Sequence, residues 1–223
     1  KGIGTQEVTV QILGDSFVNG AFFRDALLSK NYIPGIKLVG LRNIKNEEGQ
    51  YDEGRGGWTV KKYFEIPKGE MTSYHGYMQP VGEYRYWGSC EFWKNCYKVI
   101  NGELTDTEIV YNCGRYDQCI TKFDKETGYL AAPKKNDLMY DNARGSYMVY
   151  TEKKWKNVEV DERKWAFNYR KYLDMWNLDA PKFFAQMLGL NDYRDSLTAD
   201  YDWCIQCLKR AKRVHNTHLV LSD

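Results

Sequence analysis

A short run of apolar and β-branched side chains near the start of the chain ends abruptly at a glycine. Residues 8–13 read VTVQIL and are followed directly by Gly14-Asp15-Ser16. The run predicts a strand over residues 7–13, because β-branched residues favour strands and glycine interrupts them. The first constraint on the fold is therefore a buried strand whose carboxyl end carries polar residues.

Segments of strand and helix character alternate along much of the remaining chain. Strands are predicted over residues 36–41, 183–188 and 218–221, and helices over residues 21–29, 165–176 and 199–214, with a further helix beginning in 58–64. Strands that alternate with helices pair in parallel. The pattern predicts an α/β fold with a doubly wound, flavodoxin-like parallel sheet, whose ligand crevice lies at the carboxyl ends of the strands.

The stretch from 65 to 159 has a different texture, with short apolar runs and many Tyr, Trp, Gly and Lys residues. Strand-like pieces at 96–100, 108–111 and 147–150 are separated by turn signals. We therefore expect an α/β domain over residues 1–64 and 160–223, interrupted by a β-rich insertion over 65–159. Five aromatic residues of the insertion either form stacking platforms for a glycan or pack its own core; they are Tyr84, Tyr86, Trp87, Trp93 and Tyr97.

Composition excludes several classes of partner. The 32 Lys and Arg residues nearly balance the 30 Asp and Glu residues, and no basic stripe is present, so nucleic acid is not an expected partner. No apolar run approaches the roughly 18 residues that a membrane span needs. The chain begins at Lys1 rather than Met, which suggests a processed or excised piece, and an extracellular or periplasmic location is slightly favoured over the cytoplasm.

Six cysteines occur, at positions 90, 96, 113, 119, 204 and 207. The paired gaps 90/96 and 113/119 are longer than those of structural zinc sites, so disulfides or free thiols are expected and no metal is. The pair Cys204 and Cys207 has redox spacing but lies inside a helical pattern, so it is interpreted as two helix residues.

Ser16 has two interpretations. Directly after a strand and at the start of a helix, its hydroxyl projects into the crevice, where backbone N–H groups can stabilise an oxyanion. The alternative is an ordinary helix N-cap.

Three blocks favour the first interpretation when they are taken together: Gly14-Asp15-Ser16, the segment GRGGWT at 54–59, and GLND at 189–192. In this order, on this strand pattern, they resemble the SGNH (GDSL) hydrolase family of esterases and lipases, over residues 8–59 and about 165–221. The resemblance implies that Ser16 is the nucleophile. It also implies an oxyanion hole formed by the backbone N–H groups of Ser16 and Gly57 and by the Asn191 side-chain amide, and it implies no cofactor.

The remaining candidate residues have supporting roles. Asp15 and Asp192 are expected to brace their turns, and Trp58, His75 and Tyr193 are candidate substrate contacts. The family's catalytic base is a histidine in an Asp-x-x-His block, and none of His75, His215 and His218 has Asp three residues before it. The expectation is a C-terminally truncated chain whose parent reading frame continues past Asp223.

Two functions follow from these observations. The first is a serine ester hydrolase that cleaves acyl esters of small molecules or glycans, including acetyl groups on a carbohydrate, through an acyl-serine intermediate. The second is a non-catalytic binding or structural module on the same scaffold.

Overall fold

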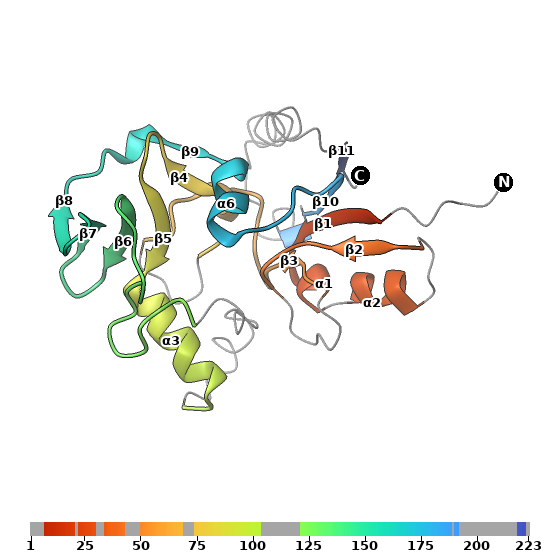
Figure 1. The fold of residues 1–223 in the computed structure, drawn as a ribbon. Helices are drawn as coiled ribbons and strands as arrows, with labels where there is room; N and C mark the ends of the chain where they lie inside the picture. The colour runs from red at the N-terminus through yellow and green to blue at the C-terminus, as the bar shows by residue number, and fades with distance from the viewer. Residues whose placement is uncertain are drawn as a thin grey trace. The chain divides into compact units, whose positions relative to one another are not determined.

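The computed structural model of the chain describes residues 7–20, 22–29, 34–42, 50–68, 74–103, 121–188, 190–191 and 218–221. The chain divides into two compact units, unit 1 with residues 1–62 and 176–223 and unit 2 with residues 63–175. The boundary predicted from the sequence was 159/160, which assigned residues 160–175 to the α/β domain. In the structure this segment belongs to unit 2. Figure 1 shows the elements of both units.

Unit 1 contains one sheet built around the strand predicted first. β1 (Val8–Gly14) pairs in parallel with β2 (Ile36–Leu38) and β10 (Phe183–Met187), and β10 pairs in parallel with β11 (His218–Leu221). The order is β11-β10-β1-β2, and the short β3 (Glu53–Gly54) also pairs in parallel with β1. β1 is followed by α1 (Ser16–Asn19) and α2 (Phe22–Ser29).

The core of unit 1 explains the position of β1. Val10 and Ile12 project from β1 into a buried cluster with Val18 of α1 and Leu38 of β2. Alternate residues of a strand share a face, so the apolar positions 10 and 12 bury one face of β1. The strand is thereby fixed in register, with its carboxyl end leading directly into α1.

Unit 2 is built from hairpins. β5 (Arg85–Ser89), β6 (Asp137–Asp141), β7 (Ser146–Tyr150) and β8 (Trp155–Val158) form a sheet in this order, with β5 parallel to β6 and the other neighbours antiparallel. β4 (Met78–Pro80) and β9 (Trp165–Phe167) form a second, antiparallel pair. The other elements are helices α3 (Cys90–Ile100) and α6 (Tyr169–Trp176) and 3-10 turns η1 (Lys61–Phe64) and η2 (Glu162–Lys164).

Aromatic rings pack the interior of unit 2. Tyr86 and Trp93 are buried, and the Trp93 ring stacks on Phe123 with centroids 3.9 Å apart and an interplanar angle of 9°. Tyr86 contacts Trp165 edge to face at 4.9 Å. Of the five aromatic residues proposed as stacking platforms, Tyr86, Trp87 and Trp93 are therefore mainly core residues, and only Tyr84 and Tyr97 are half-exposed.

The prediction of a doubly wound parallel α/β fold is wrong. The described residues contain more strand than helix, and the chain combines mixed and antiparallel sheets with the parallel one. The physical reason is local pairing: β6, β7 and β8 are consecutive strands joined by short turns, and such strands pair antiparallel without a crossover helix. The segment 96–100, predicted as a strand, is the end of α3, and the helix predicted at 58–64 is only the turn η1.

Candidate functional site

The carboxyl edge of the unit 1 sheet brings the three sequence blocks together. In the parallel register, Gly14 at the end of β1 is level with Gly54 of β3 on one side and Met187 of β10 on the other. Each of the three strands therefore ends at the same edge, and the residues that follow each strand gather there. These residues are Asp15-Ser16, the 55–58 segment and Asn191.

Asp15 organises the first block. Its carboxylate Oδ1 accepts a hydrogen bond of 3.1 Å from the Phe17 N–H, and it is the N-cap of α1. Ser16 is the first residue of α1 rather than its cap, and it is half-buried. Within the described part of the chain, the Ser16 hydroxyl makes no hydrogen bond, so it is available to a ligand at this edge.

The second block approaches the first so closely that only glycine fits at position 54. A Cβ added there would lie 2.2 Å from the backbone nitrogen of Asn19 and 2.5 Å from the backbone carbon of Val18. The Arg55 N–H donates to the Gly14 carbonyl at 2.8 Å and ties the two blocks together. Gly57 has φ of 71° and is exposed. No described residue accepts a hydrogen bond from its N–H.

Asn191 joins the third block to the other two. Its buried side-chain amide donates to the Trp58 carbonyl oxygen at 2.9 Å and lies 3.5 Å from Oδ2 of Asp15. The turn that carries Ser16 therefore lies beside the glycine-rich turn and the Asn191 amide, although residues 15 and 191 are 176 positions apart in sequence.

A buried group of charged side chains lies beneath this edge and was not predicted from the sequence. Arg55 forms an ion pair of 2.9 Å with Glu53, and Arg24 forms one of 3.6 Å with Asp52. Asp52 also accepts a hydrogen bond of 3.0 Å from the Gly54 N–H. The one available signal of this burial was the presence of both positive and negative charges within GRGG and its flanks. Buried charges need partners of opposite sign, and such a mixture can supply them.

Burial raises the pKa of Asp52 to about 7, against the opposing effects of the Gly54 N–H, Arg24 and Arg42. The folded chain therefore binds a proton that the unfolded chain has released between about pH 4 and pH 7, so the free energy of unfolding falls as pH rises through this interval. Each unit of pKa difference corresponds to about 1.4 kcal/mol.

We expect Asp52→Asn to remove this slope, because the amide cannot titrate. Urea unfolding of the wild type and the variant at intervals from pH 5 to pH 8, followed by circular dichroism, measures it. The exposed Asp179→Asn, which does not touch Arg24, is the matched control and leaves the slope in place. Parallel pH profiles for the wild type and Asp52→Asn would contradict the assignment.

The predicted substrate contacts among the described residues are buried. His75 is buried in unit 2, where one ring nitrogen pairs with the Glu65 carbonyl at 2.9 Å and the other accepts from the Tyr77 N–H at 3.1 Å. The Trp58 side chain is buried in unit 1, with the Arg55 guanidinium 5.2 Å from its ring centroid. Asp192, Tyr193 and His215 lie outside the described residues.

The described residues contain no group of three His, Cys, Asp or Glu side chains that could hold a metal ion. Cys90 and Cys96 are both buried, and burial raises the pKa of the Cys90 thiol to about 12, so Cys90 stays protonated. The other four cysteines lie outside the described ranges. Across those same ranges, no helix has the length and apolar character to cross a bilayer.

Comparisons of the chain with family models, curated proteins and solved structures found no significant match.

Proposed function

We propose that unit 1 carries a serine ester hydrolase site of the SGNH type, with Ser16 as the nucleophile. The observation that supports this most is the Asn191 amide, which bonds to the Trp58 carbonyl and approaches the Asp15 carboxylate beside Ser16. A carboxamide, a glycine-rich turn and a serine hydroxyl at one sheet edge are the components that acyl transfer needs.

The chemistry follows from these groups. Ser16 Oγ attacks the ester carbonyl carbon and its proton passes to a base; the carbonyl oxygen becomes an oxyanion in the tetrahedral intermediate. The N–H groups of Ser16 and Gly57 and the second amide hydrogen of Asn191 are the proposed donors to this oxyanion. Collapse expels the alcohol and leaves acyl-serine, which water hydrolyses in the second half-reaction.

The resemblance assigns the role of the base to a histidine. Among the described contacts, none joins a histidine to Ser16. The substrate class is an acyl ester, with acetyl groups on a carbohydrate included. Neutral donors suit such a substrate because they stabilise a developing alkoxide without the desolvation cost of a buried cation.

The second candidate is a binding module without turnover. Two observations favour it: the Asn191 amide is already bonded inside the unit, and the Ser16 hydroxyl has no base among its described contacts. In this case the edge holds a ligand but forms no covalent bond with it.

Covalent labelling separates the two candidates. A fluorophosphonate probe forms a stable adduct only with an activated serine, so we expect a single adduct located at Ser16 by peptide mass spectrometry. Ser16→Ala abolishes the adduct, whereas Ser29→Ala, at an exposed serine of α2, leaves it unchanged. Absence of any adduct, with ligand binding retained, would favour the binding module.

A further inference from the structure

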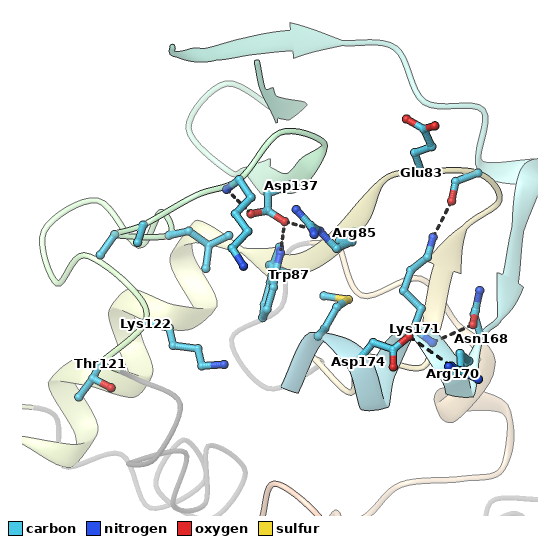
Figure 2. A pocket seen from close by; sticks show the side chains of 16 residues that line it. Glu83, Arg85, Trp87, Thr121, Lys122, Asp137, Asn168, Arg170, Lys171 and Asp174 are labelled. Carbon is cyan, nitrogen blue, oxygen red and sulfur yellow. Dashed lines mark hydrogen bonds and ion pairs between the residues drawn. The ribbon is translucent and has the colours of Figure 1, made fainter. Parts of the chain in front are cut away.

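Unit 2 contains a cavity of about 870 Å³ that the ester hydrolase proposal does not use. We propose that it binds an acidic saccharide, a ligand that combines many hydroxyl groups with a negative charge. Strand β5, the 121–134 segment and α6 form its walls, as Figure 2 shows. A cavity of this size is within the range of ligand sites and accommodates more than one sugar ring.

The charges of the lining leave a positive excess. Arg85 Nε bonds to Asp137 Oδ1 at 2.8 Å, and the same carboxylate accepts from the Trp87 indole at 2.8 Å, so Asp137 is fully engaged. Arg170 and Asp174 form an exposed pair at 3.4 Å.

Lys122 and Lys134 add two further positive charges on the 121–134 wall. The Lys122 ammonium lies 5.7 Å from the centroid of the Trp87 ring, and Lys134 is exposed, with no ion pair among the described residues. These two cations are the proposed partners of the ligand's anionic group.

Lys171 shapes the site and increases its positive potential. Its ammonium donates to the carbonyl oxygens of Pro80, Gly82 and Tyr84 at 3.0, 2.9 and 2.7 Å, so all three hydrogens are used. These bonds hold the turn between β4 and β5 against α6. Burial and the neighbouring Arg85 lower the pKa of Lys171, in that order of importance. No carboxylate neutralises this ammonium among its described contacts.

The remaining polar groups argue for hydroxyl groups on the ligand. The carboxylates of Glu83 and Asp174 already accept from Asn136 and Arg170, and their remaining acceptor sites repel a bare anion but suit sugar hydroxyls. Thr121 and Asn168 supply both donors and acceptors. Trp87, Leu130 and Met175 provide the apolar surface on which the C–H face of a sugar packs.

Titration calorimetry of the whole chain tests the proposal with four ligands: trigalacturonate, glucose 6-phosphate, maltotriose and inorganic phosphate. We expect a carboxylated or phosphorylated sugar to bind, with an affinity that falls as salt is raised. We expect maltotriose and inorganic phosphate to bind at least about tenfold more weakly, since each lacks one of the two required features. The two acidic sugars together show which kind of anionic group the site accepts.

Charge reversal then locates the site. Lys122→Glu/Lys134→Glu weakens binding of the acidic sugar by at least about tenfold. Lys125→Glu/Lys135→Glu makes the same change in net charge at exposed lysines outside the cavity, and leaves the affinity within about twofold.

The single variant Lys134→Glu is not expected to disturb folding, because the Lys134 side chain has no described contact. We expect it to weaken binding of the acidic sugar by a few-fold. The proposal is overturned if neither acidic sugar binds, if maltotriose or phosphate binds equally well, or if the cavity variants bind like the controls. Ser16→Ala leaves this binding unchanged, so the outcome is independent of the ester hydrolase proposal.

Discussion

Replacement of Asn191 by alanine lowers kcat/KM for an activated acetate ester by about 10² to 10³-fold, the usual effect of losing one oxyanion donor. In the proposed site the amide has two functions. One hydrogen holds the Trp58 carbonyl, and the other, which lies toward Asp15 Oδ2 at 3.5 Å, turns to the substrate oxygen when an ester binds. The loss is expected mainly in kcat, because the oxyanion forms only in the transition state.

Asn191→Asp is the informative companion variant. It preserves the size of the side chain but replaces the donor amide with an acceptor, so we expect a loss at least as large as that of alanine. The exposed Asn157→Ala in β8 is the matched control and retains the wild-type rate. Wild-type kinetics for Asn191→Ala would remove Asn191 from the catalytic proposal.

Replacement of Trp93 by alanine lowers the unfolding free energy of unit 2 by about 4 kcal/mol, within the range for truncating a buried tryptophan. The side chain is 1% exposed, stacks on Phe123, and donates its indole N–H to the Trp87 carbonyl. Alanine therefore leaves both a cavity and a buried carbonyl without its partner.

Hydrogen exchange of the α3 amides, measured across a guanidinium series, reports this loss for unit 2 separately from unit 1. Trp155→Ala, on the edge strand β8 and only half-buried, provides the control and is expected to cost less than half as much. Equal losses for the two tryptophans would show that the Phe123 stack contributes little.

The strands of the unit 1 sheet were the most predictable part of the chain. β1, β10 and β11 lie within one residue of their predicted ranges, because short runs rich in apolar residues bounded by polar turns carry a strong local signal. The strand predicted over 36–41 ends at Leu38, and β3 was not predicted. The convergence of Ser16 and Asn191 on one edge also followed from the strand pattern.

Local signals failed where distant residues decide the structure. Residues 96–100 contain Tyr, Val and Ile and were predicted as strand. Ser89 instead caps a helix by accepting a hydrogen bond from the Phe92 N–H, and the buried positions 92, 93 and 96 have helical spacing. The burial of the charged residues at 52, 53 and 55 was not predicted from the sequence. Their burial depends on Arg24 and on pairing with β1, and neither is visible in the residues around them.

Two glycines of the GRGG segment differ in their tolerance of substitution. At position 54 the backbones of β3 and α1 touch, so even a methyl group is excluded whatever the backbone angles are. At position 57 there is open space, and only the left-handed backbone limits the choice, a conformation that asparagine also adopts. In a set of natural variants, position 54 should remain invariant while position 57 alternates between glycine and asparagine.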